Sequence, residues 1–141
     1  MLRIIVLALV LTNVSTVPDE RDLLAGPISD AQLGELLHQQ SPTILAPALE
    51  HQLVTLAGSA LLADLTGHGR EHFPDYLPGP RPLRGHTAVR IQTGVARQVS
   101  GSGVEVLLVW AGTDPAGDQL ERQHTTVRLD YGPYGWRPVA P

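Results

Sequence analysis

The amino-acid sequence predicts an α+β fold, in which N-terminal helices pack against a curved antiparallel β-sheet. Two patterns favour this class. The segment 47–65 repeats apolar residues with a period near 3.6, which is typical of a helix. Later segments alternate apolar and polar residues, as expected for antiparallel strands with one buried and one solvent-facing side. The clearest alternation has apolar or threonine side chains at Thr125, Val127, Leu129 and Tyr131.

Two helices are expected ahead of the sheet. Ser29 begins the first, because Ser29-x-x-Gln32 has the spacing of a capping box. The pair Ser41-Pro42 ends it, since the residue before a proline is disfavoured in the helical conformation. The second and longest helix is predicted from about Pro47 to Leu65, with Pro47 in its first turn and Gly67 at its C-terminal stop.

A long connector is expected between the second helix and the sheet. The segment 67–85 is rich in proline and glycine, so a third main helix is not predicted there. We expect three apolar side chains to anchor this connector to the core: Phe73, Tyr76 and Leu77.

The sheet is predicted to begin near His86 and to be built from hairpins. In the first strand the apolar side chains fall on odd positions, Val89, Ile91, Val95 and Val99, and Gly94 is expected to mark a bulge or bend. The segment 104–110 is apolar on both faces except at Glu105, as a central strand would be. Turn residues at 100–103, 112–118 and 132–135 make every connection hairpin-like, so a parallel sheet is not expected.

Composition limits the function. The 141 residues are 43% hydrophobic and 17% charged with a net charge of −4, and all ten basic residues are arginines scattered along the chain. Because no basic run is present to follow a phosphate backbone, nucleic acid is not an expected partner. The absence of cysteine excludes disulfides, thiolate catalysis and Cys-ligated metal sites.

The N-terminus allows two interpretations. Arg3 precedes an apolar run, Ile4 to Leu11, which has the outline of a secretory signal or a membrane anchor. The alternative is a buried N-terminal strand or helical turn. The resulting division is a possible signal or anchor at 1–17, a linker at 18–28 and a single α+β domain at 29–141.

Three segments carry a resemblance to a known family: Leu61-Leu62-x-x-Leu65-Thr66-Gly67-x-Gly69, Tyr76-Leu77-Pro78-Gly79 and the closing Gly135-Trp136-Arg137-Pro138-Val139. Residues 47–139 resemble a nuclear transport factor 2-like domain and, more narrowly, the C-terminal domain of TcpC-type conjugal transfer proteins of Gram-positive mobile elements. The resemblance implies a cone of one curved sheet around helices. It also implies a membrane anchor, a place outside the cytoplasmic membrane and kinship with the inner-membrane scaffold subunit of type IV secretion systems. It transfers no catalytic residue.

One stretch matches a metalloprotease motif by letter. His68-Gly69-Arg70-Glu71-His72 has the form H-x-x-E-H, in which two His one helical turn apart bind zinc and the Glu activates water. Flanking glycines and Pro74 disfavour the helix that this site requires. We therefore expect a chance match, with a surface metal site at His68 and His72 as the alternative.

Several side chains are candidates for acid–base chemistry because a curved sheet can direct them inward. They are Asp64, Tyr76, His86, Glu105, His124 and Tyr131. The structural alternatives are a solvated Asp64 near the helix end and a Glu105 paired with an arginine of a neighbouring strand. No two of the candidates have a spacing that predicts catalysis.

The aromatic residues near the C-terminus also allow two interpretations. In the first, Tyr131, Tyr134 and Trp136, which flank one turn, form an exposed anchor for a partner. The alternative, which we favour for Trp136, is that Trp136 and Tyr131 pack into the core and leave only Tyr134 exposed.

These observations lead us to expect a non-enzymatic scaffold or assembly module of a bacterial conjugative transfer or type IV secretion-like apparatus. It would bind protein partners or itself, use no cofactor or metal, and lie outside the cytoplasm, membrane-anchored or secreted, with a cytoplasmic location as the alternative. The alternative function is a small-molecule-binding or catalytic domain of the same cone-shaped fold. A deep apolar pocket that holds an inward Asp, His or Tyr would favour this alternative.

Overall fold

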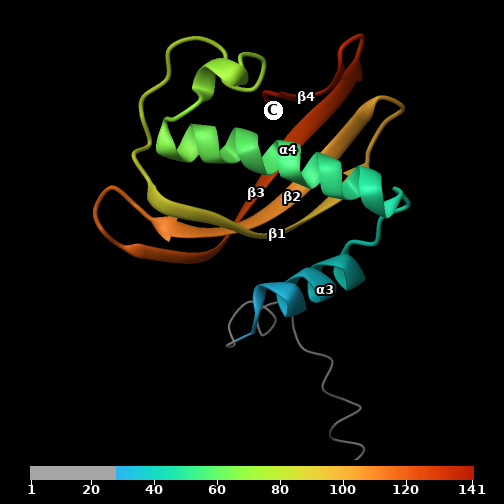
Figure 1. Ribbon diagram of the computed structural model, residues 1–141, viewed down its shortest axis with the longest axis horizontal. Coiled ribbons are helices and arrows are strands. Elements are labelled where there is room, and N and C mark those ends of the chain that lie inside the picture. The colour runs from blue at the N-terminus through green and yellow to red at the C-terminus, as the bar shows by residue number, and fades with distance from the viewer. Residues whose placement is uncertain (1–27) are drawn as a thin grey trace, which may run out of the picture.

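The computed structural model describes residues 28–141 and confirms the α+β class (Figure 1). The elements in chain order are α3 (Asp30–Gln40), α4 (Pro47–Thr66), the 3-10 turn η1 (Arg70–His72), β1 (Thr87–Gln98), β2 (Gly103–Thr113), β3 (Gln119–Gly132) and β4 (Gly135–Val139). The strands form one antiparallel sheet in the order β1-β2-β3-β4, which is curled but open. The segment 1–17 and residues 18–27 of the predicted linker lie outside the described residues. Among residues 28–141, no helix has the length and hydropathy needed to span a membrane.

Both helices begin and end close to where the sequence places them. The Ser29 hydroxyl accepts a hydrogen bond from the Gln32 amide at 3.2 Å, and the Ser29 amide donates to Gln32 Oε1 at 2.9 Å, which completes the capping box. Helix α4 starts at Pro47 and ends at Gly67, whose φ of 82° is the left-handed conformation that glycine adopts without strain.

The two helices lie on opposite faces of the sheet. Helix α4 crosses one face and forms the main core with alternate residues of β2 and β3 (Figure 1). The buried members from those strands are Val104, Val106, Leu108, Trp110, Val127 and Leu129. Helix α3 packs its buried Leu33 and Leu37 on the other face, where they meet Val95 and Val109 in a smaller second cluster. The central strand β2 is therefore covered on both sides, as its apolar sequence predicts.

The prediction that the odd residues of β1 share one face is wrong. A β-bulge between Ile91 and Thr93 shifts the register with β2, and a bulge adds one residue to its strand. Ile91 consequently packs toward the α4 core, whereas Val95 faces α3 and Val99 is 43% exposed. The bulge lies just before Gly94, not at it.

Gly94 allows α4 to approach the sheet closely. It is paired with Leu108 and buried under the helix. A Cβ atom on this residue would lie 2.8 Å from Val54 Cγ1 and 2.9 Å from Leu108 Cδ2, closer than packed carbon atoms tolerate.

The connector 67–85 has only the short η1 turn, in agreement with the sequence. Tyr76 and Leu77 are buried in the main core and Phe73 packs against it, so the predicted anchors are confirmed. Two backbone bonds hold the connector in place. The His86 amide donates to the Leu65 carbonyl at 2.9 Å and so joins the residues on either side of it, and the Ala140 amide donates to the carbonyl of Asp75 in its middle at 2.9 Å.

We expect Gly94→Ala to lower the free energy of unfolding by about 1–3 kcal/mol, the usual cost of overpacking a close-packed interior. Urea denaturation followed by circular dichroism measures the change. Gly101→Ala is the matched control, because a Cβ there meets no atom within 4 Å. Equal stabilities of the two variants would contradict the close contact between α4 and β1.

Candidate functional site

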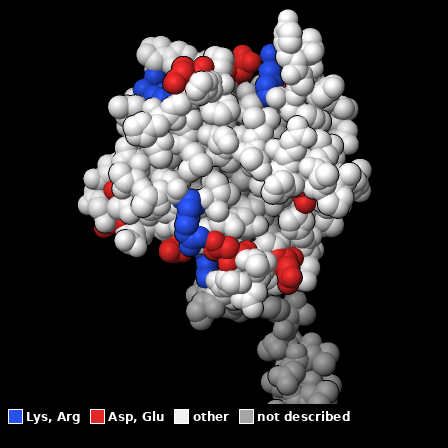
Figure 2. Space-filling model, viewed as in Figure 1, with Lys and Arg blue, Asp and Glu red and all other residues white. Residues whose placement is uncertain are grey.

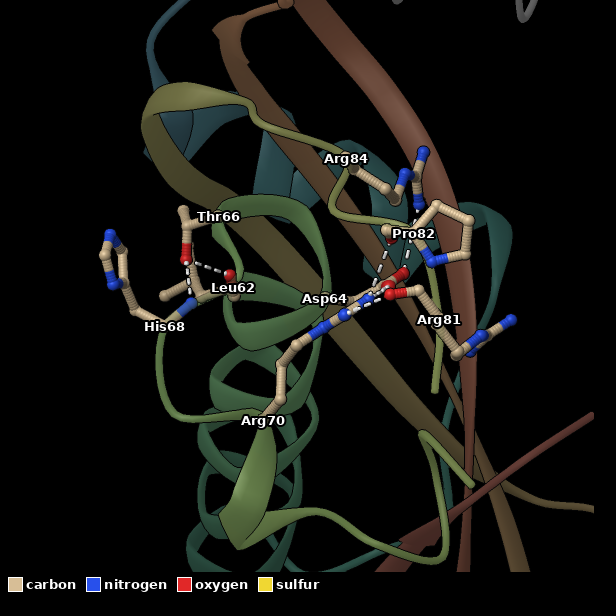
Figure 3. Close-up of polar contacts among 8 residues, drawn as sticks. All are labelled: Leu62, Asp64, Thr66, His68, Arg70, Arg81, Pro82 and Arg84. Atoms are coloured by element: carbon tan, nitrogen blue, oxygen red, sulfur yellow. Dashed lines mark hydrogen bonds and ion pairs between the residues drawn. The ribbon is translucent and has the colours of Figure 1, made fainter. Parts of the chain in front are cut away.

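The H-x-x-E-H residues are not arranged as a metal site. The structure has a 3-10 turn at Arg70–His72 in place of the helix that the motif requires, and His68 precedes that turn. His68 points away from the Asp64 cluster, which consists of Asp64 near the end of α4 with Arg70 and Arg84 (Figure 3). His72 and Glu71 are mostly exposed, with their Nε2 and Oε1 atoms 3.7 Å apart. Among residues 28–141 no group of three or more His, Asp or Glu side chains is placed to hold a metal ion.

Asp64 is a buried structural residue, and the expectation of a solvated side chain is wrong. Its Oδ2 accepts a hydrogen bond from Arg84 Nη1 at 3.1 Å, and its Oδ1 lies 3.7 Å from Arg70 Nη2. Arg70 in turn donates to the carbonyl oxygens of Arg81 and Pro82, at 2.9 and 3.2 Å (Figure 3). These bonds tie the connector to the C-terminal end of α4.

The buried Tyr76 and the half-buried His86 are the other titratable candidates near this end of α4. Burial raises the pKa of the Tyr76 phenol, and the negative charge of Asp64 raises it further. A phenol whose pKa rises is a poorer general base at neutral pH. The His86 ring packs edge-on against Trp110, with ring centroids 5.7 Å apart. Because the Asp64 carboxylate is paired with two arginines, the cluster is better suited to stabilising the fold than to transferring a proton.

The remaining acid–base candidates lie apart. Glu105 is 3.9 Å from Arg97 of the neighbouring strand, so the predicted cross-strand pair is confirmed. His124 is exposed on β3, and Tyr131 is exposed at the end of the same strand. The structure therefore brings together only Asp64 and Tyr76 among the predicted candidates.

The largest concave feature among the described cavities is an open groove between α4 and the β3–β4 hairpin. Its volume is about 620 Å³. The residues that line it come from one helix and one hairpin: Gln52, Thr55, Leu56, Ser59, Tyr131, Tyr134, Gly135 and Trp136.

The hairpin supplies the aromatic wall. Tyr131 and Trp136 are directly paired across β3 and β4, and their rings lie 5.1 Å apart at 57°. Gly135, with φ of 100°, makes the tight turn that ends in this pair. Trp136 packs against the main core, as favoured, but Tyr131 is 60% exposed and Tyr134 is fully exposed. The alternative in which Tyr131 also packs inside is wrong, because β3 continues past Leu129, its last buried residue.

Helix α4 supplies an uncharged polar wall. Each of the four lining residues has another of them three or four positions away, so they share one side of the helix. The Thr55 and Ser59 hydroxyls donate to backbone carbonyls one turn earlier, at 2.9 and 3.0 Å, and keep their lone pairs as acceptors. The charged side chains seen on the α4 face lie mostly near its edges (Figure 2). Sequence analysis missed this wall, although three polar residues flanking Leu56 at helical spacing were a usable signal.

The groove offers chemistry for docking. Tyrosine and tryptophan present flat apolar surface together with a polar atom, which suits a partner that is part apolar and part hydrogen-bonding. Its lining residues include no Asp, Glu, His, Lys or Arg, and thus no acid–base pair.

No protein-family model, curated protein or solved structure matches this chain.

We expect Asp64→Asn to lower the free energy of unfolding by about 1–3 kcal/mol, because it leaves the largely buried Arg70 without its carboxylate. Asp75→Asn is the matched control. Its ion pair with Arg137 joins two side chains that are each more than half exposed, so its loss should cost below about 1 kcal/mol. Chemical denaturation of both variants gives the comparison, and equal losses would show that Asp64 is not a structural clamp.

Proposed function

We propose that this protein is a non-enzymatic scaffold or assembly module that docks a segment of a partner protein in the groove between α4 and the β3–β4 hairpin. One observation carries the proposal. Half of the six aromatic residues of the chain gather at this groove, and two of them, Tyr131 and Tyr134, are held mainly in solvent. Exposed aromatic side chains on a rigid hairpin are costly to solubility unless they serve binding.

The composition of the groove supports a protein partner. Interface centres are enriched in Tyr and Trp and depleted of charged side chains, and both properties describe this lining. The aromatic pair of Tyr131 and Trp136 is preorganised by strand pairing, so little side-chain entropy is lost when a partner binds. The Gln52, Thr55 and Ser59 side chains supply hydrogen-bonding groups for a polar rim.

The proposed setting is a membrane transfer complex, conjugative or type IV secretion-like. This part of the proposal rests on the resemblance to nuclear transport factor 2-like domains of TcpC-type proteins. The curled sheet over helix α4 is compatible with that resemblance.

A small-molecule ligand is the second candidate function, favoured by the size of the groove. Ligand sites commonly occupy roughly 300–1,000 Å³, and this groove falls in that range. The concave face of the sheet, where a deep pocket of the cone fold would lie, is instead filled by core side chains such as Leu53, Leu61 and Leu108. That filling favours the scaffold over a buried active site.

Photo-crosslinking tests the docking surface. A photoreactive phenylalanine analogue replaces Tyr134 in the full chain, expressed in its native host. The matched control carries the same analogue at Ile44, which is 90% exposed and does not line the groove. We expect a discrete protein adduct at position 134 alone. The adduct partner is then purified and its Kd measured by calorimetry.

In that assay we expect Tyr131→Ala combined with Tyr134→Ala to weaken binding at least tenfold, because truncated aromatic anchors commonly cost about 2 kcal/mol or more. The double variant should lower the unfolding midpoint only slightly, because Tyr134 is fully exposed and Tyr131 loses a single cross-strand ring contact with Trp136. Adducts that are identical at the two positions, or a Kd unchanged by the double substitution, would contradict the proposal. Binding of a small metabolite that protects Tyr134 from labelling would favour the second candidate.

A further inference from the structure

Helix α3 is attached to the rest of the molecule through one small apolar cluster and through polar contacts at its two ends. It lies outside the main core, against the edge strand β1 (Figure 1). Its apolar attachment is the cluster of Leu33 and Leu37 with Val95 and Val109. Polar contacts hold its two ends: Asp30 at the first turn bonds to Arg90 of β1, and His38 at the last turn bonds to Glu50 of α4.

The geometry of His38 requires a charged imidazole ring. Its Nδ1 lies 2.8 Å from the Gly34 carbonyl oxygen, and its Nε2 lies 2.7 Å from Glu50 Oε1. A carbonyl and a carboxylate both only accept hydrogen bonds, so both ring nitrogens must donate. Neutral imidazole carries one N–H, and therefore one of the two bonds is lost when the ring releases its proton.

Glu50 makes this contact a junction of three elements. Its Oε1 faces His38 of α3, and its Oε2 accepts a hydrogen bond from the Ala96 amide of β1 at 3.2 Å. The carboxylate is only 12% exposed and is held by β1 whether or not His38 is charged. A neutral His38 places one unprotonated nitrogen against an oxygen atom. That oxygen belongs either to the Glu50 carboxylate, which β1 holds in place, or to the Gly34 carbonyl of the same helix, and in both cases the closed arrangement of α3 loses a hydrogen bond.

The charged and titratable groups around this junction are few. The open cavity beside it is lined by His38 from α3, by Pro47, Glu50, His51 and Val54 from α4, and by Ile91, Thr93 and Gly94 from β1. In this cavity β1 contributes uncharged side chains, and α4 contributes Glu50 and the exposed His51. A second cavity at the C-terminal end of α3 adds the ion-paired Arg97 of β1 and Glu105 of β2, next to Ser41. The two histidines differ in their contact with Glu50: His38 forms a hydrogen bond with its carboxylate, and this bond is the one that the His51 control leaves unchanged.

We propose that α3 is a pH-responsive clasp: protonated His38 closes it onto Glu50, and loss of that proton lets α3 open from the sheet and uncover Val95 and Val109. The occupant of the uncovered surface is α3 itself, so the device needs no further ligand. The proposal is independent of the aromatic groove, which lies between α4 and the other end of the sheet.

The direction of the pH effect follows from linkage. The Gly34 carbonyl raises the pKa of His38, and the Glu50 carboxylate raises it further, while burial opposes them. A raised folded-state pKa gives stability that is fully present below the ordinary histidine pKa of about 6.5 and is lost as the pH rises through the folded-state pKa. The clasp is therefore closed in mild acid and opens more often in mild alkali.

Hydrogen exchange on the full chain, followed by NMR between pH 6 and 9, tests the clasp. We expect α3 amides to open more often than α4 amides. After correction for intrinsic exchange, the α3 opening constant should rise about tenfold for each unit by which the folded pKa of His38, measured from its ring resonances, exceeds the ordinary value. His38→Gln, which does not titrate, should remove the rise, and His51→Gln should leave it intact.

Glu50→Gln gives a second reading that keeps the histidine. It should lower the folded pKa of His38 and shrink the rise in α3 opening. The clasp is overturned if α3 opens only together with α4, or if His38→Gln or Glu50→Gln leaves the pH dependence of α3 unchanged.

Discussion

The close packing of α4 on β1 is the constraint on which the rest of the structure depends. The helix presents small residues to the sheet, including Ala57 and Gly58, and β1 has the small residues Gly94 and Ala96. A Cβ on Gly58 would lie 3.3 Å from Ile91 Cγ1, so contact is tight on both sides. This approach sets the position of the main core, and the connector and the groove are arranged around it.

Bulges on either side of β2 allow the sheet to curl around this helix. The pairing of β1 with β2 shifts register between Thr87 and Arg90 and again between Ile91 and Thr93, and the pairing of β2 with β3 shifts between Trp110 and Gly112. The Gln92 side chain spans the last two shifts, accepting a hydrogen bond from the Arg122 amide at 3.0 Å. Extra residues of this kind bend a strand and change which side chains it buries. As a result β1 contributes to the α4 core at its start and to the α3 cluster further on.

Polar groups divide into structural and accessible sets. The Asp64 cluster ties the connector to α4, and the His38–Glu50 junction ties α3 to α4. The aromatic groove differs, because Tyr131 and Tyr134 make the hairpin end more apolar without being buried. The polar side chains that stabilise the fold therefore lie where the connector and α3 meet α4. The surface suited to binding lies where β3 and β4 extend past the core.

The order of elements, the two helix starts, the end of α4 at Gly67 and the anchors of the connector all followed from local patterns, since capping, proline and glycine geometry, and helical period act over a few residues. The β1 bulge, the burial of Asp64, the exposure of Tyr131 and the α4 wall of the groove did not. Each depends on contacts between segments that are distant in the sequence. Asp64 is neutralised only when Arg70 and Arg84 of the connector pack against the end of α4. The faces of β1 are decided only when Val54 of α4 packs against Gly94. Long-range packing decides these contacts, and no short window of sequence contains both partners.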